Sequence, residues 1–147
     1  MTQQQQTING FLVDVFNDVL RLEERSLRKE RTGLSLTELH VLETVQRVSE
    51  ERGGTMADVA AALGVTSGTL TIAVKTLEQK GYLVRTRHKT DKRRVTVSLT
   101  GAAQAVLAHH EAFHAGLVRA VAQGLPADEL DALGSALARL HHYFNTL

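Results

Sequence analysis

The chain has 147 residues, 43% of them hydrophobic, so it can bury one core but is short for an enzyme with two lobes. It contains no cysteine, which excludes disulfides and thiol-based redox switches. The formal net charge is +1, and we find neither a signal peptide nor a run of about 18 apolar residues. We therefore expect a cytoplasmic protein that does not enter the membrane.

The first part of the chain has the pattern of two helices. An apolar stripe at a spacing of three to four residues predicts a long helix over residues 8–29. The preceding MTQQQQ is expected to be a frayed tail. Ser35 and Glu38 have the spacing of a capping box, which predicts a second helix over residues 36–48.

The next segment has the pattern of two helices joined by a tight turn. Thr55 suits the N-cap of the first helix, and Gly64 supplies the left-handed residue that the turn needs. Thr66 or Ser67 caps the second helix, whose outward side is small, hydroxylic and basic. We expect this side to enter a DNA major groove. The predicted contacts there are Thr66, Ser67, Gly68, Thr69, Thr71 and Lys75.

After Gly81 the apolar pattern changes from helical spacing to alternation. Residues 82–84 and 95–99 are predicted strands, joined by the polar stretch 87–94. A basic hairpin of this kind can straddle a phosphate backbone and insert an arginine into a minor groove. Its basic side chains are Arg87, His88, Lys89, Lys92, Arg93 and Arg94. The order of elements predicts a winged helix-turn-helix over residues 55–100.

Lysine and arginine are concentrated in this module. Residues 75–94 hold eight of the 17 Lys and Arg residues against two acids, whereas the rest of the chain holds nine bases and 14 acids. A cationic face can exchange condensed counterions for phosphate contacts, so double-stranded DNA is the expected partner. A merely solvated basic face is the alternative, but its position on a winged module favours DNA.

Beyond the module, residues 102–122 and 128–144 are predicted helices separated by Gly-Leu-Pro. Together with residues 8–29 they carry more apolar surface than a small winged module can cover. We therefore expect a homodimer joined through residues 8–29 and 102–144, with two recognition helices about 34 Å apart. The expected fold class is mostly α (α+β), a winged helix-turn-helix with long terminal dimerisation helices.

The segments DVAAALGVTSGTLTIAVKTLEQKGYLVR and DKRRVTVSLT resemble the helix-turn-helix and wing of the MarR family of transcriptional regulators. The resemblance covers essentially the whole chain, residues 1–147. It implies a dimeric, sequence-specific DNA-binding regulator, expected to be a repressor, with no enzymatic activity and no required cofactor. Through the family's Asp-x-Arg wing signature it implies that Asp91 orients the neighbouring arginines and that Arg93 enters the minor groove.

Within the family, FLVDVFNDVLRLEERSLR, LSLTELHVLETV and HHEAFHAGLV are similar to repressors of fatty-acid synthesis genes, the FabT type. This similarity implies that the operator is bound more tightly when the protein holds a long acyl chain on acyl carrier protein. We expect the acyl pocket to be lined by Phe11, Val15, Leu39 and Phe113. The alternative is that these side chains fill a dimer core.

His110 and His114 are four residues apart, which places two imidazoles on one helical face. Zinc-sensing MarR relatives also resemble this chain, and their ligands imply a zinc site of Glu24, His40, His110 and His114. The chain departs from those sensors because it lacks their cysteine and the acid before each of two histidines. The set is therefore either a zinc site or a group of hydrogen-bonded side chains.

Two other classes of protein are alternatives to a DNA-binding regulator. A winged module used only for protein contacts would not need this many arginines in its wing. A small metalloenzyme would not need the wing, and no HExxH motif or nucleophile-base pair is present.

Overall fold

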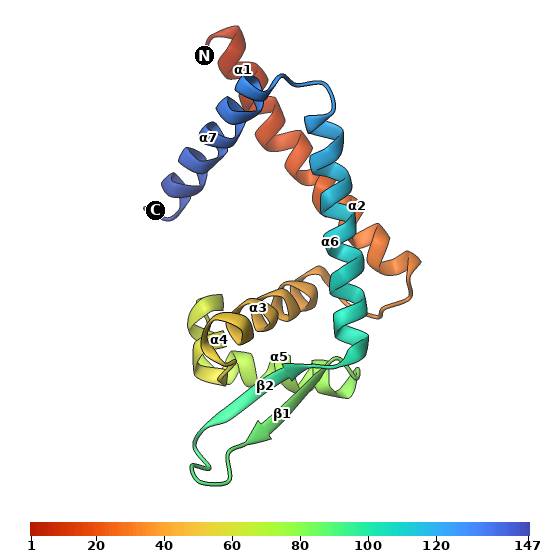
Figure 1. The fold of residues 1–147 in the computed structure, drawn as a ribbon, viewed down its shortest axis with the longest axis vertical. Coiled ribbons are helices and arrows are strands. Elements are labelled where there is room, and N and C mark those ends of the chain that lie inside the picture. Colours follow the sequence, from red (N-terminus) through yellow and green to blue (C-terminus); the bar gives the residue numbers. More distant parts are fainter. The chain divides into compact units, whose positions relative to one another are not determined.

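A computed structural model describes residues 1–147 as a mostly helical chain with one small sheet (Figure 1). It forms two compact units, residues 1–109 and residues 110–147, with the boundary inside one helix. The elements are α1 (Gln3–Gly10), η1 (Phe11–Val15), α2 (Phe16–Lys29), α3 (Leu36–Arg52), α4 (Met56–Leu63), α5 (Ser67–Gln79), β1 (Leu83–Arg87), β2 (Val95–Leu99), α6 (Gly101–Ala122) and α7 (Ala127–Phe144).

No single helix has the length and apolar composition needed to cross a membrane. Only α4 and α5 taken together, joined at a bend of 107°, meet that test of length and composition.

The chain starts with α1, η1 and α2, which continue one another because Gly10 and Phe16 at their junctions keep right-handed helical torsions. The π-helical η1 is a single widened turn within this run. The expectation of a frayed tail is wrong. The Thr2 hydroxyl accepts from the Gln5 N–H at 3.2 Å, and Gln5 Oε1 accepts from the Thr2 N–H at 2.9 Å. This capping box begins α1 at Gln3.

Local capping also determines where the central helices begin. The predicted box of Ser35 and Glu38 begins α3, which continues past residue 48 to Arg52. Thr55 caps α4, and its hydroxyl oxygen accepts from the Asp58 N–H. The turn into α5 passes through Gly64, whose φ of 66° is left-handed, and Thr66 then caps α5.

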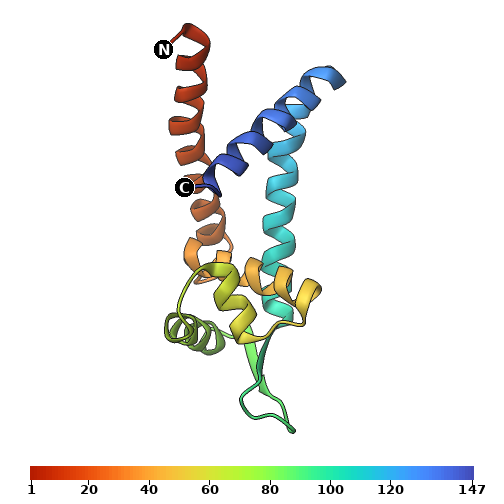
Figure 2. The same cartoon turned by 90° about the vertical axis from the view of Figure 1, so that its left-hand side faces the viewer.

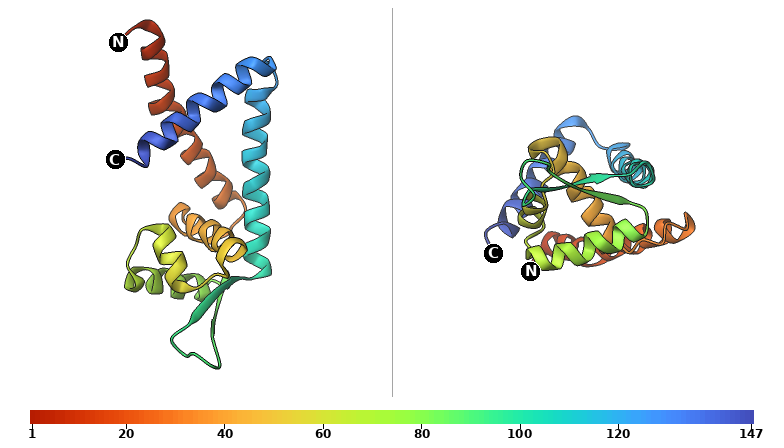
Figure 3. Two further views of the ribbon diagram at one scale, coloured as in Figure 1. Left: turned by 60° about the vertical axis from the view of Figure 1, so that its left-hand side comes forward. Right: turned by 90° about the horizontal axis from the view of Figure 1, so that it is seen from below.

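β1 and β2 pair antiparallel, from Leu83 opposite Leu99 to Arg87 opposite Val95. β1 is therefore longer than the predicted strand. Within the first unit, Figures 2 and 3 show the hairpin extending away from α3, α4 and α5, with its loop at the far end. Throughout, the wing means this hairpin with its loop, residues 83–99.

Gly54 attaches the wing to the helices. Its carbonyl accepts from the Val97 N–H at 2.9 Å, and its φ of 70° is left-handed. A Cβ at this position would lie 2.7 Å from the Ser49 Oγ, closer than side chains pack. Glycine is therefore required where the connection from α3 to α4 passes along β2.

The core of the first unit is built around α3. Leu39, Leu42 and Val45 are fully buried there, and they pack in one cluster with the apolar sides of α4, α5 and the wing. Ala103 and Leu107 of α6 belong to the same cluster. Burial of each leucine or valine stabilises the fold by about 1.5–3 kcal/mol. Burial of the apolar side of α5 therefore sets the orientation of this helix and determines which side faces solvent.

Two side chains tie the end of α5 to the loop between α2 and α3 and to the first turn of α3. The Lys80 ammonium donates to the Gly33 carbonyl at 2.7 Å and to both carboxylate oxygens of Glu38 at 2.8 Å. The Tyr82 hydroxyl donates to the Thr32 carbonyl at 2.5 Å. We call these contacts the loop lock.

The loop lock changes the acidity of Glu38. Partial burial raises the pKa of its carboxyl, but the hydrogen bonds from Lys80 and from the Ser35 N–H, together with the Lys80 charge, outweigh burial. The net result is a pKa below the usual value for glutamate.

We expect Glu38→Gln to lower the free energy of unfolding by about 1 kcal/mol near pH 7, because it removes the charge from this ion pair. Since the pKa of Glu38 is lower in the folded chain than in the unfolded chain, its contribution is present above the unfolded pKa. The contribution is lost as pH falls through the folded pKa, so the two proteins should converge only when pH lies below that folded pKa.

Urea denaturation at a series of pH values measures this difference. Glu50→Gln, an exposed carboxylate of the same helix, is the control and should leave stability unchanged. A difference between wild type and Glu38→Gln that stays constant into strong acid would contradict the prediction.

Candidate nucleic-acid interface

The outward side of α5 is polar apart from Ile72, and a buried apolar side supports it. Leu70, Val74 and Leu77 face the core. The six predicted contacts from Thr66 to Lys75 are all exposed. The Thr71 hydroxyl donates to the Ser67 carbonyl at 2.8 Å, so towards a ligand its oxygen can only accept.

A hollow of about 640 Å³ lies beside this surface, between the start of α4, the first turns of α5 and the wing. Four of its lining residues are arginines, and one is acidic. Its lining residues are Thr55, Met56, Ala57, Ser67, Thr71, Arg85, Arg87, Asp91, Arg93, Arg94 and Val95. A concave surface on which positive side chains outnumber negative ones concentrates a positive potential and attracts anions. We call it the arginine hollow.

Glu78 of α5 fixes one of these arginines. Its carboxylate accepts from the Arg85 backbone N–H at 3.1 Å and from the Arg85 Nε at 2.9 Å. The Arg85 Nη2 lies 2.9 Å from the same carboxylate. Glu78 thus attaches β1 to α5 and neutralises Arg85. No role for Glu78 was predicted from the sequence, although it is one of only two acids in the basic segment, residues 75–94.

Asp91 shapes the loop of the wing. Its Oδ1 accepts from the Arg93 backbone N–H, and its carbonyl accepts from the Arg94 N–H, both at 3.0 Å. The Arg94 carbonyl in turn accepts from the His88 N–H at 3.0 Å. These bonds hold the backbone of the loop, while the side chains of Lys89, Arg93 and Arg94 remain exposed.

The side chains predicted to line an acyl pocket have different environments. Phe11 and Val15 lie on η1 and are 51% and 39% exposed. Leu39 is fully buried in the core of the first unit. Phe113 is half-buried in the second unit, where its ring stacks on that of His110 with centroids 6.4 Å apart.

A separate hollow of about 250 Å³ lies at the junction of α2 and α3, which the sequence analysis did not predict. Its lining residues are Glu24, Leu27, Arg28, Leu34, Ser35 and Leu36. It borders the loop that the loop lock holds.

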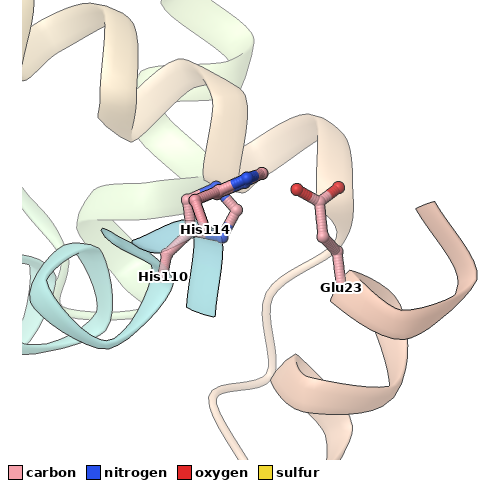
Figure 4. Close-up of side chains that lie close together, drawn as sticks. All are labelled: Glu23, His110 and His114. Atoms are coloured by element: carbon pink, nitrogen blue, oxygen red, sulfur yellow. The ribbon is translucent and has the colours of Figure 1, made fainter. Parts of the chain in front are cut away.

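In the second unit, His110 and His114 lie on neighbouring turns of α6 (Figure 4). Their Nε2 atoms are 3.0 Å apart, so the N–H of one imidazole donates a hydrogen bond to the ring nitrogen of the other. His110 is buried and His114 is half-buried. Two imidazoles at this spacing are chemically suited to be two of the four ligands of a zinc ion.

The other two predicted zinc ligands, Glu24 and His40, belong to the first unit and are both exposed. Glu23, the neighbour of Glu24 on α2, is the buried carboxylate of that helix (Figure 4). The Nε2 of His109, the last residue of the first unit, lies against the carboxylate of Glu30 at the end of α2.

Three comparisons with known proteins agree on the family. The MarR family model matches residues 32–94, which include the helix-turn-helix and most of the wing. The uncharacterized HTH-type transcriptional regulator YkoM of Bacillus subtilis is 30% identical over 113 residues, 76% of this chain and 71% of that protein.

The crystal structure of Streptococcus pneumoniae FabT in complex with DNA is 32% identical, with a TM-score of 0.84 over 97% of this chain and 98% of that one. The crystal structure of the Staphylococcus aureus MepR–DNA complex is 18% identical, with a TM-score of 0.66 over 88% of this chain and 91% of that one, a likeness of fold. The chain belongs to the MarR family of DNA-binding transcriptional regulators.

Proposed function

We propose that the chain is a homodimeric repressor that binds a specific operator duplex through α5 and the wing. The observation that carries this proposal is the arginine hollow, which Ser67 and Thr71 of α5 share with four arginines. One module thus offers polar groups to base edges and cations to the adjacent phosphates, which is the division of contacts that DNA recognition uses. The similarity to FabT, solved in complex with DNA, supports the proposal.

The proposed contacts follow from where the side chains lie. The outward side of α5 enters the major groove. Arg93, at the end of the wing, reaches the minor groove, where the negative potential is strongest when the groove is narrow. Arg87, His88, Lys89 and Arg94 lie on or near phosphates. Asp91 contributes by holding the loop through its bond to the Arg93 N–H.

Dimerisation is proposed from the apolar side chains that each unit leaves exposed. On the first unit Ile8, Val13 and Phe16 are more than half exposed, and on the second unit Val118 and Phe144 are. Exposed apolar surfaces of this extent are usually covered by a partner. A second copy of the chain would cover them and would place two copies of α5 on half-sites about one helical turn apart.

We propose long acyl chains carried on acyl carrier protein as the effector, because of the similarity to FabT over nearly the whole chain. Phe11 and Val15 offer exposed apolar surface for such a chain. An acyl chain changes operator affinity only if it binds one separation of the two recognition helices better than another.

A zinc-responsive regulator is the second candidate, favoured by the close pair of His110 and His114 nitrogens. Those two histidines would hold the ion, with Glu24 and His40 as the proposed further ligands. In the first candidate the same two histidines are satisfied by hydrogen bonding.

We expect Arg93→Ala to weaken operator binding by about tenfold to a hundredfold and to reduce the preference for A·T-rich flanks. Lys89→Ala should weaken binding to all sequences about equally. It should also reduce the slope of log affinity against log salt concentration by about the contribution of one phosphate contact. Fluorescence anisotropy at several salt concentrations measures both effects.

Arg47→Ala is the matched control, because it removes one exposed positive charge from α3 rather than from the wing. It should bind the operator like wild type. If Arg93→Ala and Lys89→Ala also bound like wild type, the proposed role of the wing would be wrong.

We expect long-chain acyl carrier protein to tighten operator binding by about fivefold or more, the usual size of such a coupling. Acyl carrier protein without an acyl chain is the control and should have no effect. An unchanged operator affinity over a broad range of acyl carrier protein concentration would count decisively against the acyl effector.

For the histidine pair we expect DNA binding that is insensitive to a chelator and a purified protein without stoichiometric zinc. His110→Ala should lower the free energy of unfolding by about 1–3 kcal/mol, because it leaves the partner imidazole without its hydrogen bond. Elemental analysis that finds about one zinc per chain, with chelator reproducing the effect of His110→Ala on DNA binding, would favour the zinc-responsive regulator instead.

A further inference from the structure

The middle of the outward side of α5 is apolar. At about 100° per residue, Gly68, Ile72 and Lys75 point opposite to the buried Leu70 and Val74. The Ile72 side chain is 71% exposed. Burial in the core therefore does not account for a large β-branched hydrocarbon at this position, and Ile72 is not among the DNA contacts predicted from the sequence.

Gly68, one turn before Ile72, gives an independent observation. Its φ is not left-handed, so the backbone does not require glycine. A Cβ built at this position would meet only the Thr66 Oγ1, at 4.0 Å, so the interior of the protein does not require glycine either. Glycine weakens a helix relative to alanine. Glycine at position 68 is explained if another molecule approaches the helix closely here, because a side chain would block that approach.

The groups around Ile72 limit what it can recognise. Thr69 and Thr71 are exposed on either side of it, and Lys75 follows one turn later. These neighbours can bond to polar base edges, whereas the Ile72 side chain can neither donate nor accept a hydrogen bond. The apolar group that a major groove offers at a base edge is the C5 methyl group of thymine.

We propose that Ile72 reads a thymine methyl group and that the missing side chain at Gly68 lets α5 enter the groove deeply enough for this contact. The inference rests on the proposed function, because it presupposes that α5 lies in the major groove. It adds a specificity-determining residue that acts by apolar contact rather than by hydrogen bonding.

The test begins with a duplex pool of randomised centre, from which the wild-type protein selects its preferred sequence. Each thymine of the selected duplex is then replaced singly by deoxyuridine, which removes only the methyl group. At one position in each half-site we expect the wild type to bind the deoxyuridine duplex about fourfold more weakly, the effect of one buried methyl group. Ile72→Ala should bind both duplexes with equal affinity.

Two further variants separate this contact from general damage. Lys75→Ala should weaken binding but keep the ratio between the thymine and deoxyuridine duplexes. Gly68→Ala should raise or preserve the midpoint of thermal unfolding and yet weaken duplex binding by about tenfold, a combination that damage to the fold would not produce.

The outcomes distinguish the inference from the proposed function on which it rests. A wild-type protein that selects a sequence but shows no preference for thymine dependent on Ile72 would overturn the thymine contact and leave the DNA-binding function standing. A Gly68→Ala protein that binds like wild type would overturn the close approach. Selection of no sequence above random DNA would overturn the proposed function itself.

Discussion

The winged helix-turn-helix of residues 55–100 depends on holding several positive side chains on one small surface. Arg87, Arg93 and Arg94 line the same hollow and form no salt bridge in the structure. The two acids of the segment support this surface without neutralising those three side chains. Glu78 binds Arg85, and Asp91 accepts from a backbone N–H rather than from a guanidinium. The remaining repulsion destabilises the free protein, and phosphate groups would relieve it on binding.

Local signals made most of the fold predictable from the sequence. The boundaries at Ser35, Thr55 and Gly64 depend on residues within about four positions, so their capping and turn geometry can be read directly. The start of α1 was predicted incorrectly because the Thr2 and Gln5 capping box was taken for part of a polar tail. The fold class, a mostly helical winged helix-turn-helix, is confirmed by the likeness to solved MarR-type structures.

Features that depend on two distant segments were not predictable in the same way. The length of β1 is set by the pairing of Arg87 with Val95 across the hairpin. The bond that holds Arg85 needs Glu78 on another element, and no local sequence pattern around either residue predicts it. At Gly68 the sequence showed only a small residue, whereas the structure shows that neither torsion nor crowding requires it.

The loop lock sets a condition on any effector that acts on α5 from the side of α2. The Lys80 ammonium and the Tyr82 hydroxyl both donate to backbone carbonyls of the loop between α2 and α3. A displacement of this loop must therefore break those bonds or carry the end of α5 with it. Because Thr66 caps the opposite end of the same helix, a small rotation of α5 would redirect the outward groups that are proposed to contact DNA. A ligand that binds equally well before and after this displacement would not change the orientation of α5, however tightly it binds.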